Sequence, residues 1–343
     1  MNTTTLSSRP LDALPLPESP AFVPEAAVSR KGKRLLLAVL VFIFASVLLV
    51  VSIFAYAAYL LTHPKVAALS LNPMSAKNLP YSDVSFPSAD GASQVHGWWI
   101  PGGSERTVVL SHGFGANREE PWVPMYDIAE LLNGWNYNVL MFDYGFADPV
   151  RPSAATGGIA ESQQLLGALQ FARSQGSAEL VVWGFSMGAG TALQAALQTD
   201  LIDGMILDST FLADEDTIYE NINRYVSLPR PLTLNLVRLL FPLWSGYSVD
   251  QIPSEQAQST DYPFPIMLVY GTADDKSPQW MTENIAAAQS HPSSELWIVP
   301  DVLHEMIFRT HTEEYVERAS VFLDGISRSS GSGETVPGET FAV

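Results

Sequence analysis

Gly184-Phe185-Ser186-Met187-Gly188 places one serine between two glycines, after a run of strand-forming residues and before a run of small, helix-forming ones. A serine at a sharp strand-to-helix turn has a strained backbone, and glycines two residues away on either side avoid collisions there. The following helix offers a backbone N–H and the positive end of its dipole to a developing oxyanion. We therefore interpret Ser186 as a nucleophile. The alternative is a serine that caps the helix, with glycines that allow close packing.

The same glycines do not form a nucleotide-binding loop. A dinucleotide fingerprint requires G-x-G-x-x-G, and Ser186 stands where the second glycine would be. A phosphate-binding loop of the G-x-x-x-x-G-K-[ST] type requires a lysine, which is absent after Gly188. A reactive hydroxyl is the interpretation that this spacing favours.

His304 is the histidine that best suits a general base for Ser186. The chain holds six histidines: His63, His96, His112, His291, His304 and His311. When nucleophile, acid and base occur in that order, the base lies near the end of the chain. His304 follows the strand-like run 295–299, so a loop beyond that strand would bring its imidazole to the serine. His291 precedes the same strand, and His311 is expected to open the final helix.

An acid that orients His304 is expected at the end of the preceding strand. The run 265–270 leads into Gly271-Thr272-Ala273-Asp274-Asp275. We predict that Asp274 holds the imidazole and stabilises its charged form. Asp275 is the alternative, because it could instead cap the next helix or pair with Lys276.

The loop after 107–111 is expected to complete an oxyanion hole. It reads Ser111-His112-Gly113-Phe114-Gly115. Gly113 permits a backbone that points N–H groups inward, so the N–H of Phe114 is predicted as a donor beside that of Met187. We expect His112 to support this loop by hydrogen bonding. With no cysteine and no H-E-x-x-H spacing, we expect neither a metal nor a cofactor.

Strand and helix signals alternate from Tyr81 onward. Strands are predicted at 84–86, 95–100, 107–111, 138–143, 180–185, 204–208, 265–270 and 295–299, with a hairpin around Asp90-Gly91. Helices are predicted at 122–132, 158–175, 186–197, 279–288 and 312–326. Apolar strands that alternate with helices indicate an α/β fold with a mostly parallel central sheet covered on both faces.

The segment 211–260 interrupts this alternation. It shows no clear strand, carries Pro229, Pro231 and Pro242 among its prolines and is rich in leucine. An insertion after a central strand is well placed to cover a site at the carboxyl edge of the sheet. We interpret it as a helical cap; the alternative is a helical excursion that only completes the core.

Residues 35–61 form an uncharged apolar run of 27 residues. About 20 residues suffice to span a bilayer, and a signal peptide has a shorter apolar core. We therefore predict one retained transmembrane helix. Arg30, Lys31, Lys33 and Arg34 precede it, which favours a cytoplasmic N-terminus and an extracytoplasmic body in a single-pass protein of the cell membrane.

Charge and composition indicate how the rest of the chain is organised into segments and a domain. The formal net charge is −18, made up of +2 in residues 1–34 and −20 in the rest of the chain, which argues against nucleic acid as a partner. Serine, threonine and proline at the start, and serine and glycine at the end, indicate disordered segments at 1–34 and 327–343. The predicted organisation is completed by a linker at 62–80 and a catalytic domain at 81–326.

Taken together, these motifs resemble the α/β-hydrolase superfamily, and in particular membrane-anchored bacterial hydrolases of the serine aminopeptidase-like and acylglycerol-lipase-like group. The resemblance rests on the His112-Gly113 loop, the Gly184–Gly188 turn, the strand before Asp274 and the late His304. It implies the α/β-hydrolase fold and hydrolysis through an acyl-serine intermediate without a cofactor. One departure is that many relatives carry Asp-x-Arg-Gly after the fourth strand, whereas this chain has Asp143-Tyr144-Gly145 without the arginine.

The predicted function is therefore a membrane-anchored serine hydrolase, of the carboxylesterase or lipase type, that acts on small-molecule or lipid esters. The apolar insertion and the membrane helix motivate the lipid class. A peptidase or amidase would use the same residues. A non-catalytic binding module on the same fold is the alternative from a different class.

Overall fold

The computed structural model describes residue 1, residues 30–224 and residues 227–331, with side chains described as far as Ile326. The segments 2–29 and 332–343, where disorder was predicted, lie outside the described residues. Two predicted boundaries were wrong. Helix α1 (Arg30–Thr62) begins before residue 35, and α11 (Thr312–Gly331) continues past Ile326. Extending an existing helix is easier than starting one, and arginine and lysine are good helix formers.

Helix α1 is long and apolar enough to cross a membrane, and a signal sequence would pass the same test. The chain divides into two units inside this helix, after Val50. Residues from 51 onward, including the last turns of α1, belong with the α/β body.

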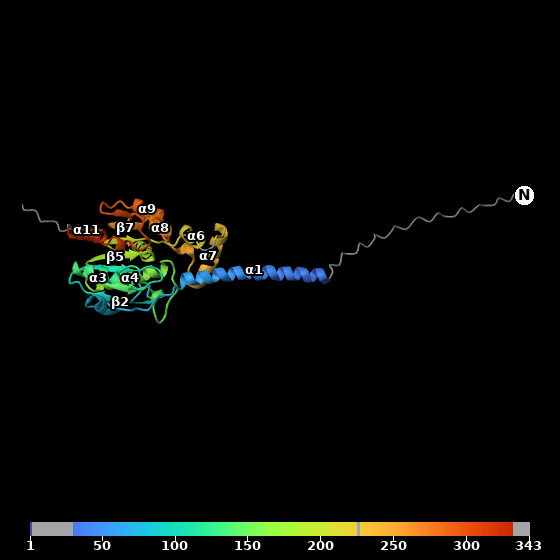
Figure 1. Ribbon diagram of the computed structural model, residues 1–343, viewed down its shortest axis with the longest axis horizontal. Helices are drawn as coiled ribbons and strands as arrows, with labels where there is room; N and C mark the ends of the chain where they lie inside the picture. The colour runs from blue at the N-terminus through green and yellow to red at the C-terminus, as the bar shows by residue number, and fades with distance from the viewer. Residues whose placement is uncertain (2–29, 225–226, 332–343) are drawn as a thin grey trace, which may run out of the picture. The chain divides into compact units, whose positions relative to one another are not determined.

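The body is built on one eight-stranded sheet (Figure 1). Its strands run in the order β1-β2-β4-β3-β5-β6-β7-β8. The first two pair antiparallel, as the predicted hairpin requires, β2 is antiparallel to β4, and all the other pairs are parallel. The bounds are β1 (Ser82–Pro87), β2 (Gln94–Ile100), β3 (Arg106–Ser111), β4 (Asn138–Asp143), β5 (Glu179–Phe185), β6 (Gly204–Asp208), β7 (Ile266–Gly271) and β8 (Glu295–Val299). The mostly parallel sheet predicted from the sequence is confirmed.

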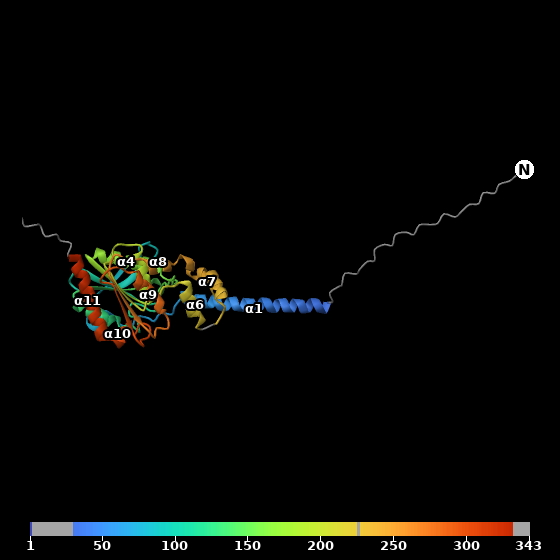
Figure 2. The same cartoon turned by 90° about the horizontal axis from the view of Figure 1, so that it is seen from above.

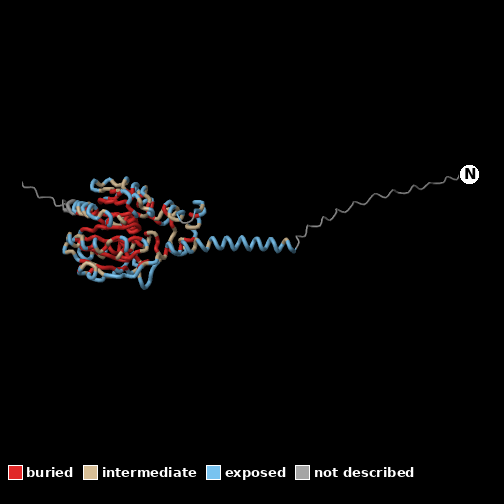
Figure 3. Tube along the Cα trace, viewed as in Figure 1, coloured by how far each residue is buried: buried red, intermediate tan, exposed pale blue. Residues whose placement is uncertain are grey.

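Helices cover both faces of this sheet (Figure 2). Because strand side chains alternate, Val109 of β3 joins one core while Val108 and Leu110 join the other. Buried residues follow the strands through the body (Figure 3). The helices of one face are α4 (Ile159–Ser174), α5 (Met187–Ala196), α8 (Ser254–Ser259) and α9 (Gln279–Ala288), and those of the other face are α3 (Met125–Gly134), α10 (Ile307–Thr310) and α11.

Helix α3 begins three residues later than the predicted start at residue 122. Pro124 stands at its N-cap. A proline disfavours helical backbone in the residue before it, so the helix starts only after Pro124. The residues between β3 and α3 are thereby left as an irregular loop, which becomes important at the site.

The segment after β6 forms helices and no strand within 211–224 and 227–260. We call α6 (Glu215–Asn223), α7 (Arg230–Ser245) and η2 (Val249–Gln251) the insertion. Asn221 of α6 donates to the carbonyl of Lys276, 3.1 Å away, in the loop after β7. The insertion is thus tied to the edge of the sheet at which the strands end. The remaining short elements are α2 (Pro73–Lys77) and η1 (Gly145–Ala147).

Candidate active site

Ser186 lies in a strained turn between β5 and α5. Its φ of 50° and ψ of −117° place it in a region that a residue with a side chain rarely adopts. Such strain is typically about 1–3 kcal/mol and persists where neighbours hold it. Here the Ser186 N–H donates to the Asp208 carbonyl at 2.9 Å, and the Phe211 N–H donates to the Ser186 carbonyl at 3.1 Å.

The two flanking glycines are required by close backbone contacts. A Cβ on Gly184 would lie 2.7 Å from the Cα of Ala189. A Cβ on Gly188 would overlap the carbonyl oxygen of Ser111 at the end of β3. The predicted reason for G-x-S-x-G therefore holds in this structure, because the glycines let the turn fold against α5 and against the neighbouring strand.

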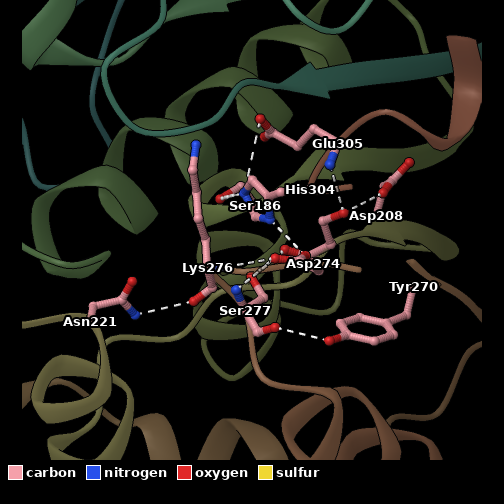
Figure 4. A network of polar contacts seen from close by, with 10 residues as sticks. Ser186, Asp208, Asn221, Tyr270, Asp274, Lys276, Ser277, His304 and Glu305 are labelled. Carbon is pink, nitrogen blue, oxygen red and sulfur yellow. Dashed lines mark hydrogen bonds and ion pairs between the residues drawn. The ribbon is translucent and has the colours of Figure 1, made fainter. Parts of the chain in front are cut away.

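His304 and Asp274 lie in line with Ser186 (Figure 4). His304 Nε2 is 2.9 Å from Ser186 Oγ, and His304 Nδ1 is 2.7 Å from Asp274 Oδ2. The three residues come from loops after β5, β7 and β8, which are parallel and therefore end at one edge of the sheet. The structure thus brings together the three residues that the sequence order predicted.

The hydrogen bonds determine the imidazole tautomer. A carboxylate only accepts, so His304 Nδ1 carries the proton that bonds to Asp274 and Nε2 is free to accept from Ser186 Oγ–H. The other oxygen of Asp274, Oδ1, accepts from the N–H groups of Lys276 at 2.8 Å and Ser277 at 2.9 Å. Asp275, the alternative acid, is exposed. The geometry selects Asp274 as the partner of the imidazole.

The two predicted oxyanion donors lie at the same sheet edge. Phe114 belongs to the loop after β3, and Met187 is the first residue of α5, where an N–H has no acceptor within its own helix. Strands β3 and β5 are neighbours, with Ser111 opposite Gly184. This neighbourhood is consistent with the predicted oxyanion hole, and the donor role of the two N–H groups stays a prediction.

His112 supports the loop after β3, as expected. Its Nε2 accepts from the Tyr144 N–H at 3.1 Å, so its Nδ1 carries a proton, which bonds to the Gly113 carbonyl at 2.9 Å. Burial lowers the pKa of His112 to about 4. The ring is therefore neutral at neutral pH and holds β3 against β4.

Sequence reasoning missed the partner of Asp143. Arg118, in the loop after β3, reaches Asp143 Oδ2 with its guanidinium at 2.6 Å and Asp143 Oδ1 with its own N–H at 2.8 Å. Both side chains are buried, and the guanidinium stacks 4.7 Å from the Trp98 ring centre. The carboxylate of Asp143 is thus paired with an arginine from the loop after β3.

Sequence reasoning also missed a pair of buried glutamates. Glu120 lies in the loop after β3, and Glu305 directly follows His304. Glu120 Oε2 accepts from the Gly113 N–H at 2.6 Å, while Glu305 Oε2 is 4.0 Å from His304 Nε2. The Oε1 atoms of both glutamates are buried without a hydrogen-bond partner among the described residues.

The two glutamates lie close together around Gly113. A Cβ on Gly113 would meet Glu305 Oε1 at 2.7 Å and Glu120 Oε1 at 3.6 Å. Burial, together with the nearby charge of Glu120, raises the pKa of Glu305, and burial also raises the pKa of Glu120. The pair therefore holds a proton at a pH at which an ordinary carboxyl has lost it.

Backbone strain gathers around the same place. Glu120, Ser209 and Glu305 have φ values of 37°, 52° and 59°, alongside Ser186 at 50°. The Glu305 N–H donates to Ser209 Oγ at 3.0 Å, which links two of these residues. Concentrated strain is typical of functional sites. Within residues 30–224 and 227–331, no group of three His, Asp or Glu residues is arranged to hold a metal ion.

Known proteins share this arrangement of elements. At 24% identity and a TM-score of 0.62, the esterase Pf2001 of Pyrococcus furiosus aligns with 78% of this chain and 97% of its own. A thermophilic esterase of Thermogutta terrifontis aligns with 71% of this chain and 99% of its own, at 17% identity and a TM-score of 0.51. At these identities the similarity shows the fold alone.

Two bacterial relatives cover much of the same chain. The uncharacterized protein YfhR of Escherichia coli K12 is 26% identical over 263 residues, which are 74% of this chain and 82% of the relative. The uncharacterized protein Rv2307c of Mycobacterium tuberculosis H37Rv is 29% identical over 240 residues, which are 68% of this chain and 75% of the relative. Residues 108–318 match the alpha/beta hydrolase family, and this match spans more than half of the sequence. The chain therefore belongs to the alpha/beta hydrolase family.

Proposed function

We propose that this protein is a membrane-anchored serine hydrolase that cleaves carboxylic esters through an acyl-serine intermediate. The observation that carries the proposal is the pair of hydrogen bonds from Ser186 Oγ to His304 Nε2 and from His304 Nδ1 to Asp274 Oδ2. This is the geometry that a nucleophile, a general base and an orienting acid require. Membership of the alpha/beta hydrolase family agrees with it.

The reaction follows from the hydrogen-bond directions. Ser186 Oγ attacks the ester carbonyl carbon while its proton passes to His304 Nε2, and Asp274 stabilises the imidazolium that results. The N–H groups of Phe114 and Met187 stabilise the tetrahedral oxyanion. When the intermediate collapses, the imidazolium protonates the leaving alcohol. A water molecule then releases the acyl group from Ser186 by the same steps.

Esters are proposed over amides because two of the similar structures are esterases by name. Lipid or acylglycerol esters are proposed because α1 is suited to a bilayer and because the insertion is apolar. The basic residues Arg30 to Arg34 favour a cytoplasmic N-terminus, with the body on the outside of the cell membrane. An amidase with the same three residues is the second candidate.

A fluorophosphonate probe tests the mechanism, because it reacts covalently with an activated serine. We expect the full chain to be labelled and Ser186→Ala to remain unlabelled. Ser177→Ala is a suitable control, since Ser177 is also buried but lies before β5, at the opposite end of that strand from Ser186, and is expected to leave labelling intact. A folded wild type that resists the probe would contradict the proposed mechanism.

Two further assays refine the proposal. An ester series of increasing acyl length, run beside aminoacyl amides, separates an esterase from an amidase. Protease added to intact cells should digest the body if it lies outside. A body that stays protected would contradict the proposed orientation.

A further inference from the structure

Helix α7 carries a stripe of four leucines, of which Leu232, Leu239 and Leu243 are exposed and Leu236 is half-buried. Leu232, Leu236, Leu239 and Leu243 follow one another at spacings of four, three and four residues, which places them on one side of the helix. Leu239 is 62% exposed and Leu243 is 69% exposed. Leu234 and Leu240 are buried. We call Leu232, Leu236, Leu239 and Leu243 the leucine stripe.

The same helix contacts the last turns of α1. Trp244 Nε1 donates to the Ala55 carbonyl at 3.0 Å. The Trp244 ring also packs edge-on against Tyr59 at 5.2 Å and against His63 at 6.4 Å, measured between ring centres. These contacts lie within the unit that begins at Val51, and they link α7 to the end of the apolar helix.

The length of the apolar run indicates at which level of the membrane α7 contacts α1. The run holds 27 uncharged residues, whereas about 20 cross the hydrocarbon core. If the core takes the first 20, the segment 55–61 lies at the level of the lipid headgroups. Exposed Tyr56 and Tyr59 fit this level, because tyrosine and tryptophan favour membrane interfaces. Trp244, and with it α7, meets α1 at that level.

The chain after α1 is fastened to the loop that follows β3. Asn117 donates to the Ala67 carbonyl at 2.9 Å, and the N–H groups of Ser70 and Leu71 donate to the Glu119 carboxylate at 2.7 and 2.6 Å. This is the loop that carries Phe114, a predicted oxyanion donor. The end of the membrane helix therefore lies near the candidate site as well as near α7.

From these contacts we infer that the leucine stripe is a docking surface for the lipid bilayer, so that α7 lies in the interface and the site receives its ester from the membrane. The inference rests on the proposed function, in that it assumes α1 spans the membrane and Ser186 cleaves esters. An apolar helix face set at headgroup depth matches the way interfacial helices bind, by burying leucine and tryptophan at the boundary between headgroups and acyl chains. The stripe itself carries no charge, so the docking is apolar in origin.

The depth of the stripe can be measured without any assay of hydrolysis. The chain has no cysteine, so Leu239→Cys or Leu243→Cys gives a single attachment site for a spin label. The full chain is placed in phosphatidylcholine nanodiscs, one chain to each disc, and the label is exposed to a water-soluble relaxation agent. Val321→Cys on α11 is the matched control, because Val321 is 68% exposed. We expect the labels on α7 to be at least about fivefold less accessible than the label on α11.

A second measurement tests the delivery of substrate. In the double variant Leu239→Ser/Leu243→Ser, the rate on a long-chain ester embedded in the bilayer, divided by the rate on a water-soluble short-chain ester, should fall about tenfold. Val321→Ser should leave this ratio unchanged. A tenfold fall supports docking, and an unchanged ratio in the double variant contradicts it.

The outcomes separate the docking surface from the proposed function. Labels on α7 as accessible as the label on α11 would overturn the inference even if esters are cleaved. Shielding that appears only when two chains share a disc assigns the stripe to a second copy and also overturns it. Shielded labels in a chain that cleaves no ester would confirm the docking and refute the proposed activity alone.

Discussion

The carboxyl of Asp274 and those of the Glu120–Glu305 pair lie beside His304, and they differ in how many hydrogen-bond donors reach their oxygens. Asp274 receives three: the imidazole Nδ1–H and the N–H groups of Lys276 and Ser277. The side chains of Glu120 and Glu305 are equally buried, yet each has one carboxyl oxygen without a hydrogen-bond partner among the described residues. Burial raises the pKa of both glutamates, and the opposing effects are smaller: the Gly113 hydrogen bond and Lys276 for Glu120, and His304 and Lys276 for Glu305.

The difference shows that equally buried carboxyls can differ in how fully their oxygens are hydrogen-bonded. The donors to Asp274 fix the position of its carboxyl group, so that it can orient the imidazole and stabilise an imidazolium. In the Glu120–Glu305 pair, the N–H of Gly113 is the donor to Glu120, and burial of both carboxyls together with the charge of Glu120 raises the pKa of Glu305. Asp274 is therefore suited to the reaction, whereas the glutamate pair favours bound protons.

The largest effect is expected for Asp274→Asn. The imidazole would lose its charged partner, and the tautomer with the proton on Nδ1 would no longer be fixed, so kcat on a short soluble ester should fall about 10⁴-fold. Asp275→Asn is the matched control and should change kcat by less than about threefold, because Asp275 is exposed. Similar losses in the two variants would refute the assignment of the acid.

A smaller effect, on stability, is expected for Arg118→Met, which leaves Asp143 buried without its cation. Breaking a buried pair in this way lowers the free energy of unfolding by about 3–5 kcal/mol. Arg318→Met is the control, because Arg318, like Arg118, pairs with a carboxylate and stacks on a tryptophan, but at the surface. Its loss should stay below about 1 kcal/mol. Urea unfolding of both variants in detergent measures the difference.

The last effect concerns how the stability of the fold changes with pH. The Glu120 pKa is about 8 in the folded chain, against an ordinary value of 4.5. Between these values the folded state binds more protons than the unfolded state, so the free energy of unfolding falls as pH rises from about 4.5 to about 8 and levels off above that.

Glu120→Gln and Glu305→Gln should therefore reduce the difference in Tm between pH 5 and pH 8. Glu255→Gln changes an exposed carboxyl and should leave the difference as it is in the wild type. A difference in Tm that is the same in all three variants would show that the glutamate pair holds no proton, and the contrast with Asp274 would disappear.

Much of the candidate site was predictable from local patterns. Gly184 and Gly188 around a serine indicated the turn, and Asp274 and His304 followed from their places after strand-like runs. Parallel strands end at one edge of a sheet, so residues after several strands converge even when they are far apart in sequence. The boundaries of α1, α3 and α11 were less predictable, because helix ends depend on neighbouring prolines and on the small free energy of adding one more turn.

Other contacts could not be predicted, although the residues that form them can be read in the sequence. Glu305 stands next to His304 in the sequence, yet nothing local indicates that its side chain turns toward Glu120. Arg118 lies in the loop after β3 and Asp143 is the last residue of β4, and their pairing depends on β3 lying beside β4. The leucines of α7 indicated an apolar segment in the sequence. Which of them are exposed depends on how α7 packs against the rest of the protein.

The amino-acid sequence by itself determined the alternation of strands and helices, the strained turn at Ser186 and the order of nucleophile, acid and base. These depend on backbone preferences and side-chain periodicity, which act between near neighbours. Only the tertiary structure decided the pairing of Glu120 with Glu305, of Arg118 with Asp143 and of Trp244 with α1. Such contacts join residues distant along the chain, and their geometry exists only once the sheet has ordered its strands and the helices have packed against it.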